Sequence, residues 1–471
     1  MSSLISDLFP ERVVAIAGAV RDAGGRALLV GGCVRDLILR IEPKDWDLEV
    51  YGVEPARLRA LLDEFGQVNV VGEAFAVYKL GPYLDVSLPR RERKSGRGHR
   101  AFVIEGDPSM TFEDAGLRRD FTVNAILQDP LTGEIIDPFG GQADIRSKTL
   151  RAISAETFTE DSLRVLRAAQ LAARFEFEIE PATVALCQGM DLTDLPAERV
   201  WGEVEKLLLR ARCPSIGLDW LKKLGALNQL FPEIAALMEV PQDPEWHPEG
   251  DVFVHTLLVA NRARELIDGL PYPKQVTVML AAVAHDFGKP ATTEFLEGRL
   301  RSRGHEEAGV APTESFLDRL KIRSLDGYDV RGQVIALVRD HLKPGEFFKK
   351  QDEVGDGAFR RLARKCELDL LYRVAKADSL GRNTEDLPRE KWFTAEAQDW
   401  FIQRAKELEV DQQPPAPILL GRHLLELGLE PGPRLGEITR VIYEMQLDGR
   451  VRDLEQARAA AQRILAADER G

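Results

Sequence analysis

The chain of 471 residues has few cysteines and no long apolar run. Its four cysteines form no Cys-x-x-Cys pair and lie far apart, at Cys33, Cys187, Cys213 and Cys366. This distribution argues against a disulfide framework or a cysteine zinc site, and it favours a reducing cytoplasm. No apolar stretch approaches the ~18 residues that a membrane helix needs, so we expect no membrane partner. Residues 1–9 lack the basic-then-apolar order of a secretory signal.

The chain also lacks an excess of basic residues, because 63 Lys and Arg stand against 77 Asp and Glu, a net charge of −14. Phosphate backbones are usually met by basic surface, so the total alone argues against a nucleic-acid partner. The imbalance is local, however. Residues 101–250 hold 14 basic and 26 acidic side chains, whereas residues 90–100 hold six basic and one acidic. RNA contact needs only a local basic strip, so the total does not exclude it.

Secondary-structure signals divide the chain into four parts. Short strand patterns mix with helical ones up to about Glu160, and from there strand signals nearly vanish. Proline-rich segments at 241–248 and 412–417 mark two further boundaries, with helices expected from Val252 to about Asp378. We therefore expect an α+β fold with a head at 1–155, a helical neck and body at 156–240, a second helical domain at 241–385 and a helical tail at 386–471.

Individual elements follow from the same patterns. Strands are expected at 27–30, 46–51, 68–71 and 84–88. Helices are expected at 56–65, 161–175, 197–211 and 216–224.

The strongest local signal is a glycine turn followed by two aspartates. Asp45 and Asp47 are two apart in a strand pattern, so both side chains point to the same face. Two adjacent carboxylates repel each other unless a cation lies between them, and oxygen ligands suit Mg²⁺. Upstream, a strand runs into Gly31-Gly32 and a helix start that contains Arg35, which allows close backbone approach to a phosphate. Together these residues indicate a nucleotidyl-transfer site, in which metal ions activate a 3′-hydroxyl and steady pyrophosphate.

A second group of polar residues lies further along the head. Arg118 and Arg119 can clamp triphosphate oxygens with bidentate hydrogen bonds. Asp120 and Asn124 are four apart, so on a helix both would face the same site, to bind ribose or orient the arginines. Asp85, in another strand pattern, is a candidate for a third carboxylate or a surface polar residue.

Asp161 and Arg164 open a helical pattern and are three apart, so they would be adjacent on one face. A carboxylate can accept from an exocyclic amine while a guanidinium donates to a ring acceptor. Cytosine and adenine carry that amine, whereas uracil and guanine have a carbonyl in its place. The same spacing also fits a helix cap with a salt bridge of about 0.3–0.5 kcal/mol, and spacing alone favours this second interpretation.

These motifs occur in an order that resembles a known family. They are Gly31-Gly-Cys-Val-Arg-Asp, Asp45-Trp-Asp, Arg118-Arg-Asp-Phe-Thr-Val-Asn-Ala, Asp137-Pro-Phe-Gly-Gly and Glu160-Asp-Ser-Leu-Arg-Val-Leu-Arg-Ala. Their order and spacing resemble those of the class II tRNA nucleotidyltransferase and bacterial poly(A) polymerase family, from about Ala27 to Ile234. The resemblance implies a polymerase-β-like nucleotidyltransferase head followed by an all-helical neck and body. It also implies metal binding by Asp45 and Asp47, and a protein template made by Asp161 and Arg164, with Arg167 in the same motif.

The resemblance also gives a role to the basic stretch. The family's flexible loop, which helps switch from C to A addition, corresponds to Arg90–Arg100. The expected RNA contacts are its basic residues Arg90, Arg91, Arg93, Lys94, Arg97 and Arg100, on a face turned away from much of the acidic surface. One departure stands at Gln170 and Leu171, where the family usually has Arg-Phe, and it puts one arginine contact in doubt.

Five of the seven histidines lie between His247 and His341. Imidazole with carboxylate is a good ligand set for a divalent transition metal such as Mn, Ni, Fe or Zn, and such a metal activates water against a phosphate ester. Four residues resemble the ordered ligands of HD-domain phosphohydrolases, and two more histidines extend the pattern. The four are His255, His285, Asp286 and Asp378, and the two are His305 and His341. Residues 246–256 resemble the linker into the HD domain of bacterial CCA-adding enzymes, some of which have 2′,3′-cyclic phosphodiesterase and phosphatase activity.

The combined pattern predicts a template-independent tRNA nucleotidyltransferase that adds CCA to tRNA 3′ ends from CTP and ATP, with Mg²⁺ in the head and a metal-dependent phosphohydrolase in the HD domain. One alternative is an A-adding enzyme or a poly(A) polymerase. Another is an HD phosphohydrolase with an RNA-binding head, against which the intact Asp45 and Asp47 speak. The expected partners are tRNA, CTP and ATP in the cytoplasm, and the patterns leave a monomer and a homodimer both open.

Overall fold

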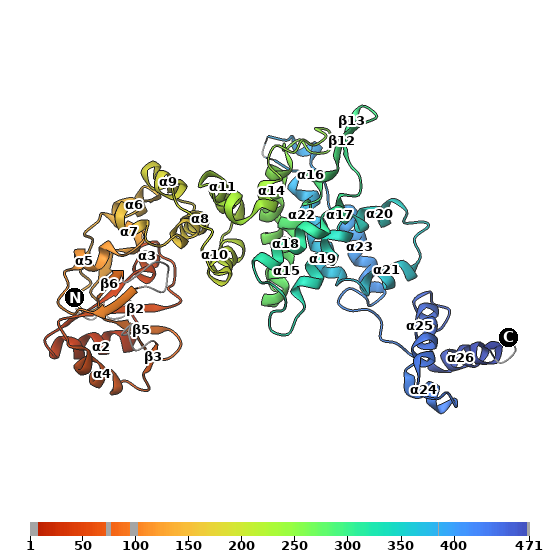
Figure 1. The fold of residues 1–471 in the computed structure, drawn as a ribbon, viewed down its shortest axis with the longest axis horizontal. Helices are drawn as coiled ribbons and strands as arrows, with labels where there is room; N and C mark the ends of the chain where they lie inside the picture. Colours follow the sequence, from red (N-terminus) through yellow and green to blue (C-terminus); the bar gives the residue numbers. More distant parts are fainter. Residues whose placement is uncertain (1–7, 72–76, 95–101, 385, 469–471) are drawn as a thin grey trace. The chain divides into compact units, whose positions relative to one another are not determined.

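The computed structural model describes residues 8–71, 77–94, 102–384 and 386–468. By its internal contacts the chain divides into two units (Figure 1). Residues 1–195 and 220–230 form the first unit, and residues 196–219 and 231–471 form the second.

A seven-stranded mixed sheet organises the first unit (Figure 1). Its central strands are apolar on alternate residues or throughout, and Leu28, Leu48 and Val86 are completely buried. β1 pairs antiparallel with β2, and β2 pairs parallel with β5. In pairing order the strands are β3 (Asn69–Val71), β4 (Val77–Lys79), β5 (Leu84–Ser87), β2 (Trp46–Tyr51), β1 (Arg26–Val30), β8 (Leu127–Gln128) and β9 (Ile135–Ile136).

Short helices and small sheets complete this unit. α2 (Glu11–Asp22) buries Val13, Ile16 and Val20 at helical spacing and packs on β1. Two further sheets have two strands each, the antiparallel pair β6 (Arg90–Lys94) and β7 (Phe102–Gly106) and the parallel pair β10 (Thr149–Leu150) and β11 (Glu178–Ile179). The remaining helices are α3 (Gly32–Ile38), α4 (Pro55–Asp63), α5 (Phe112–Leu117), α6 (Gly141–Arg146), α7 (Ala155–Phe158), α8 (Leu163–Phe175), α9 (Pro181–Gln188) and α12 (Ala226–Leu230), with the 3₁₀ turn η1 (Thr122–Asn124).

The second unit is almost wholly helical (Figure 1). Its centre is α15 (Tyr272–Ala284), in which every residue from 276 to 284 is buried, and α14 (Val252–Leu266) and α22 (Leu368–Gly381) pack on it and on each other. Around them lie α16 (Lys289–Thr292), α17 (His305–Ala308), α18 (Val310–Arg319), α19 (Val330–Asp340), α20 (Lys343–Lys349), α21 (Asp356–Ala363) and α23 (Glu396–Glu407), preceded by α10 (Ala197–Arg210) and α13 (Pro232–Ala235). α11 (Pro214–Lys223) falls at the boundary between the units.

The C-terminal helices have an apolar cluster of their own. α24 (Gly421–Glu426), α25 (Pro433–Leu447) and α26 (Leu454–Asp468) bury Leu424, Ile438, Ile442, Ala457 and Ala461 together. Among the described residues, no helix combines the length and the apolarity needed to cross a membrane.

The α+β class is confirmed, with a mixed sheet first and helices after it. The expectation of helices from Val252 to about Asp378 is wrong at one place. β12 (Thr293–Leu296) and β13 (Arg299–Ser302) form a hairpin there. Its two-residue turn has positive φ at both Glu297 (52°) and Gly298 (80°), a geometry that matches the twist of paired strands.

Candidate active sites

Three aspartates meet at the edge of β2 and β5. The parallel register places Asp47 directly beside Asp85, and Asp45 lies two residues before Asp47. Burial, Asp85 and Asp45 together raise the pKa of Asp47 to about 6, against the opposing effect of Arg119 and Lys79. The Lys79 Nζ atom lies 3.2 Å from Asp85 Oδ2. This carboxylate cluster (Asp45, Asp47, Asp85) holds more negative charge than its neighbours neutralise, which fits a divalent cation with oxygen ligands.

The glycine turn lies against this cluster. Gly31, at the end of β1, has a φ of 75°, in the left-handed region that favours glycine. A Cβ atom on Gly31 would lie 3.2 Å from Arg119 Nη1 and 3.9 Å from Asp47 Oδ2, and one on Gly32 would lie 3.3 Å from Arg35 Nη2. The Gly31-Gly32 turn therefore lies close to Asp47, Arg119 and Arg35, as the motif order predicts.

Glu49 is a site residue that our sequence interpretation missed. Its side chain is 1% exposed, and its two oxygens face Arg118 Nη2 at 2.7 Å and Arg119 Nη2 at 3.4 Å. Tyr51 Oη donates to it at 2.7 Å. Burial alone would raise the pKa of Glu49, but Arg119 and Arg118 hold it below its ordinary value. Glu49 thus orients Arg118 and Arg119. The sequence signal for Glu49 was the alternation of the strand, which puts residue 49 on the same face as Asp47.

Replacing Glu49 with glutamine should destabilise the fold by about 3 kcal/mol, because it leaves two partly buried arginines without their carboxylate. Urea unfolding of Glu49→Gln at neutral pH measures the loss. Glu64→Gln, at an exposed glutamate of the same unit, should unfold like the parent. Equal stability of Glu49→Gln and the parent protein would contradict the clamp.

The shifted pKa of Asp47 predicts a pH-dependent stability in metal-free protein. Above about pH 6 the carboxylate is charged in both the folded and the unfolded protein. Its burial and its repulsion by Asp85 and Asp45 then raise the free energy of the folded state. Well below its unfolded pKa of 3.8 the group is neutral in both states and the cost vanishes. Asp47→Asn should therefore stabilise the EDTA-treated protein by about 1–3 kcal/mol at pH 7 and by much less at pH 4. Urea unfolding at both pH values tests this, and an equal gain at both would contradict it.

Four of the predicted nucleotide-binding residues form one chain of hydrogen bonds, which is buried except at Arg167. Arg35 Nη1 donates to Asn124 Oδ1 at 2.6 Å, and Asn124 Nδ2 donates to Asp120 Oδ1 at 2.9 Å. Arg167 Nε donates to Asp120 Oδ2 at 2.7 Å. Burial opposes the charge of Asp120, yet Arg167 and Asn124 keep its pKa below the ordinary value. The network fixes these side chains relative to α3 and α8.

Asp120 and Asn124 do not share an α-helix, because only the 3₁₀ turn η1 lies there among the described residues. Phe121 is extended and bridges to Ala152, while its N–H donates to Asp120 Oδ1. The two side chains still meet, but through this turn and not through a shared helical face.

Asp161 and Arg164 also differ from the expected arrangement. α8 begins at Leu163, so Asp161 precedes the helix, and its Oδ1 accepts from Leu163 N–H at 3.1 Å. Arg164 Nη1 and Nη2 donate to the backbone carbonyls of Thr157 and Arg118. Burial lowers the pKa of Arg164, and Asp120 and Asp161 act against that shift. Arg164 is thus held by the backbone with Asp161 nearby.

The departure from the family pattern lies on α8. Gln170 is 3% exposed, and its Nε2 has no hydrogen-bond partner in the part of the chain that the structure describes. Leu171 beside it is also buried. Gln170 therefore replaces the arginine that is usual in the family, and the arginine contact has no counterpart at this position.

The basic stretch falls partly on a hairpin. Arg90, Arg91, Arg93 and Lys94 belong to β6, which pairs with β7, so these positions are a strand and not a loop. Arg97 and Arg100 lie outside the described residues. RNA contact by this stretch stays a prediction.

All six predicted metal ligands of the second unit converge. His255 lies on α14, His285 and His341 end α15 and α19, His305 begins α17, and Asp286 and Asp378 come from the α15 end and from α22. Each is buried, with exposure of 8% or less. We call these residues (His255, His285, Asp286, His305, His341, Asp378) the HD cluster.

Asp286 stands at its centre. His285 Nε2 lies 3.2 Å from Asp286 Oδ2, and His305 Nε2 lies 3.3 Å from Oδ1. His255 Nε2 is 3.0 Å from Asp378 Oδ1 and 4.0 Å from Asp286 Oδ2, and His341 Nε2 is 3.3 Å from His305 Nε2. Histidines and carboxylates thus face one another in two overlapping groups that could hold a metal ion.

Backbone carbonyls fix the protonation of three of these histidines. Nδ1 of His285, His305 and His341 lies 2.8, 2.7 and 2.7 Å from the carbonyl oxygens of Ala282, Ser302 and Val338. A carbonyl only accepts, so Nδ1 carries the proton and Nε2 keeps its lone pair toward the cluster.

The chemistry of the cluster fits a divalent metal. His285 Nε2 and Asp286 Oδ2 are buried and make no hydrogen bond of good geometry within the described residues. Burial and the neighbouring His305 and His285 lower the pKa of His341 to about 3, so this imidazole is neutral and can act as a ligand.

A pocket of about 220 Å³ opens onto the cluster. It is lined by Asp286, Asp378, two cationic side chains, Lys289 and Arg382, and residues of the 241–247 segment. Lys289 Nζ lies 2.7 Å from both Asp286 Oδ2 and Gln242 Oε1. Cations beside a metal-ligand set suit a phosphate ester. Our sequence interpretation missed Lys289, although it follows the His285-Asp286 pair by one helical turn.

Comparisons with known proteins agree with this geometry. The model of the poly(A) polymerase head domain matches residues 27–151, that of the probable RNA and SrmB-binding site of polymerase A matches residues 176–238, and that of the HD domain matches residues 252–383. A multifunctional CCA protein of Xanthomonas campestris pv. campestris (strain B100) is 39% identical over 376 residues, which cover 77% of this chain and 87% of the relative. The chain belongs to the multifunctional CCA protein family. A family member of Haemophilus influenzae (strain PittGG) is 43% identical over 305 residues, 63% of this chain and 71% of the relative.

Solved structures of CCA-adding enzymes have the same overall fold as this chain. A Bacillus stearothermophilus CCA-adding enzyme in complex with CTP aligns with a TM-score of 0.64 at 18% identity, over 98% of this chain and 99% of that one. A Thermotoga maritima CCA-adding enzyme complexed with tRNA aligns with a TM-score of 0.61 at 18% identity, over 98% of each chain. The expected resemblance and the polymerase-β-like fold are both confirmed.

Proposed function

We propose that this protein is a tRNA nucleotidyltransferase that adds CCA to tRNA 3′ ends from CTP and ATP without a nucleic-acid template. The observation that carries the proposal is the carboxylate cluster beside the Gly31 turn, with Arg118 and Arg119 anchored on Glu49. Membership of a family whose curated members are named multifunctional CCA proteins supports the same activity.

The residues of the head have separate roles in this proposal. Asp45 and Asp47, with Asp85 beside them, would hold Mg²⁺, which when bound lowers the pKa of a 3′-hydroxyl and neutralises charge on the departing pyrophosphate. Arg118 and Arg119 bind triphosphate oxygens, and Glu49 aims them. The pairing of Arg119 with Glu49 is loose at 3.4 Å, so its guanidinium retains donors for a phosphate.

Base selection falls to Asp161 and Arg164. Arg164 is held by two backbone carbonyls, so its remaining N–H groups have fixed directions and can donate to a base edge. A carboxylate at Asp161 accepts from the amine that cytosine and adenine carry, and it repels the carbonyl that uracil and guanine carry there. One pair thus selects CTP and ATP.

RNA binding is assigned to other parts of the chain. We place RNA contacts on Arg90–Arg100, on the neck and body at 156–240, where the model of a probable RNA-binding site matches, and on the helical tail from residue 386. This completes a division into a head at 1–155, a neck and body at 156–240, an HD domain at 241–385 and that tail.

We also propose that the HD cluster makes this protein a metal-dependent phosphohydrolase of the 2′,3′-cyclic phosphodiesterase type. The six ligands would hold Mn, Ni, Fe or Zn, which when bound supplies an activated water. Lys289 and Arg382 line the adjoining pocket and would bind the phosphate oxygens. Three Nε2 atoms face two buried aspartates, and the Nε2 atom of His341 lies beside that of His305, which supports this second activity.

The proposed nucleotidyl transfer is tested by incubating the protein with Mg²⁺ and labelled tRNA transcripts, offering each NTP alone. A transcript lacking CCA should gain two residues from CTP, and one lacking only the last residue should gain one from ATP. UTP and GTP should give no product. Extension of the second transcript by ATP, with no incorporation of CTP on either transcript, would indicate an A-adding enzyme.

A further inference from the structure

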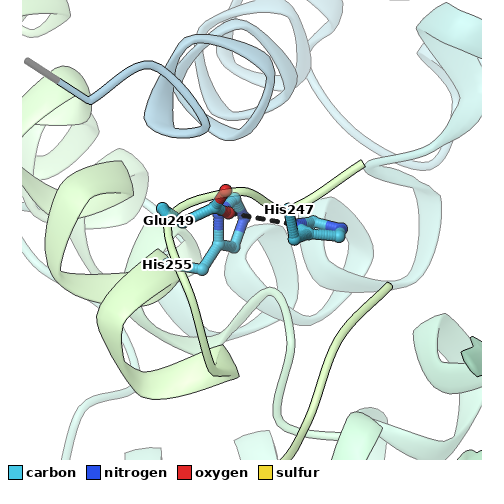
Figure 2. Close-up of side chains that lie close together, drawn as sticks. All are labelled: His247, Glu249 and His255. Atoms are coloured by element: carbon cyan, nitrogen blue, oxygen red, sulfur yellow. Dashed lines mark hydrogen bonds and ion pairs between the residues drawn. The ribbon is translucent and has the colours of Figure 1, made fainter. Parts of the chain in front are cut away.

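One carboxylate oxygen connects two histidines at the entrance to α14 (Figure 2). Glu249 Oε1 lies 2.6 Å from His255 Nδ1 and 2.9 Å from His247 Nδ1. The side chains of Glu249 and His255 have no exposed surface, and His247 is 14% exposed. Glu249 and His247 belong to the segment that precedes α14, and no metal ligand was expected there.

His255 differs from the other three histidines of the HD cluster. Those three each place Nδ1 against the carbonyl three residues earlier. His255 lies inside the first turn of α14, where the Val252 carbonyl already accepts from the Thr256 hydroxyl at 2.8 Å. A carboxylate from outside the helix takes the place of that carbonyl, with its oxygen close to Nδ1 although the N–H is not aimed straight at it.

The contact between Glu249 and Nδ1 also affects Nε2, on the other side of the His255 ring. Carboxylate oxygens accept and do not donate, and they face both ring nitrogens of His255, Glu249 at Nδ1 and Asp378 at Nε2, the latter at 3.0 Å. A metal ion at Nε2 would leave the ring proton on Nδ1, toward Glu249. The negative charge also makes Nε2 a stronger ligand. The same oxygen holds Nδ1 of His247, a residue that lines the pocket beside the cluster.

We propose that Glu249 is a positioning residue of the HD cluster, which fixes the tautomer and ring orientation of His255 and of His247 through one oxygen. The segment before α14 thereby becomes part of the metal site and of its pocket. This inference rests on the proposed metal-binding function of the HD cluster.

Calorimetric titration of Mn²⁺ into the EDTA-treated full-length protein tests it. Glu249→Gln should bind Mn²⁺ about 10- to 100-fold more weakly than the parent, with unchanged stoichiometry. Glu245→Gln, at an exposed glutamate of the same segment, should bind within about twofold of the parent, because its carboxylate pairs with Arg299 instead of a metal-ligating histidine. Unchanged affinity in Glu249→Gln overturns the proposal. So does the loss of a whole equivalent of metal, which would make His247, Glu249 and His255 a metal site of their own.

A further variant separates this inference from the function on which it rests. If Asp286→Asn loses Mn²⁺ binding while Glu249→Gln binds like the parent, only the role of Glu249 fails. If the parent protein binds no Mn²⁺, the metal site and the inference fail together.

The tautomers give a readout that a purely packing role would not change. Long-range ¹H–¹⁵N correlation spectra of metal-free, ¹⁵N-histidine-labelled protein should show His255 and His247 protonated at Nδ1. In Glu249→Gln, at least one ring should gain the Nε2-protonated form, while the unfolding midpoint in EDTA shows that the fold is retained. Unchanged tautomers in the variant would contradict the proposal.

Discussion

Nucleotide addition by Asp45→Ala and by Asp47→Ala should each fall at least about 10³-fold in kcat, equivalent to about 4 kcal/mol of transition-state stabilisation. Asp47 lies on β2 beside Asp85, and Asp45 immediately precedes that strand, so removing Asp45 or Asp47 takes a carboxylate from the ligand set for Mg²⁺. The loss should appear in kcat at saturating CTP, because Arg118 and Arg119 still bind the triphosphate. Single-turnover assays with a tRNA transcript lacking CCA measure it.

Asp63→Ala provides the control for that experiment. Asp63 is an exposed aspartate of α4 whose carboxylate pairs with Arg59 on the surface. Its kcat should stay within about twofold of the parent, since exposed pairs contribute little. Activity of Asp47→Ala within about tenfold of the parent would show that this carboxylate is not a metal ligand in the reaction.

Hydrolysis of a 2′,3′-cyclic nucleotide by Asp286→Asn should fall at least about 10³-fold, together with the binding of Mn²⁺ or Ni²⁺. Both oxygens of Asp286 are used, one facing His305 and the other facing His285 and Lys289. An amide in that place loses the charge that the metal and the lysine require. Nucleotide addition should not change, since the carboxylate cluster is built from other residues.

Asp268→Asn, with a side chain that is 79% exposed, should hydrolyse the cyclic nucleotide like the parent. Parallel assays of hydrolysis and nucleotide addition on all three proteins check the prediction. Hydrolysis by Asp286→Asn at the parent rate would exclude the HD cluster as its site, and loss of both activities would point to a general folding defect.

The strand pattern and the residue order allowed much of both sites to be predicted. The strand expected at 46–51 is confirmed as β2, which carries Asp47, while Asp45 lies in the bend just before it. The ordered histidines and aspartates pointed to the HD cluster, whose members do meet. These features depend on local periodicity and on a ligand order that resembles known families.

Contacts between distant segments were harder to predict. Glu49 pairs with Arg118 across 69 positions in the sequence, and the alternation along β2 does not say which strand face the arginines reach. Asp161 was placed on a helix, but its own side chain accepts from Leu163 N–H and the helix begins two residues later. Glu249 could not be identified, because its role depends on a ring nitrogen of His255 that only the folded chain brings within 2.6 Å of it.

The most direct test of the proposed function is the sequence of the 3′ ends that the protein makes. A tRNA transcript lacking CCA is incubated with Mg²⁺ and all four NTPs, and the extended ends are sequenced. We predict that most products end in CCA and that extension stops there. Products that carry only A, or long A tails on this transcript and on an unrelated RNA, would contradict CCA addition.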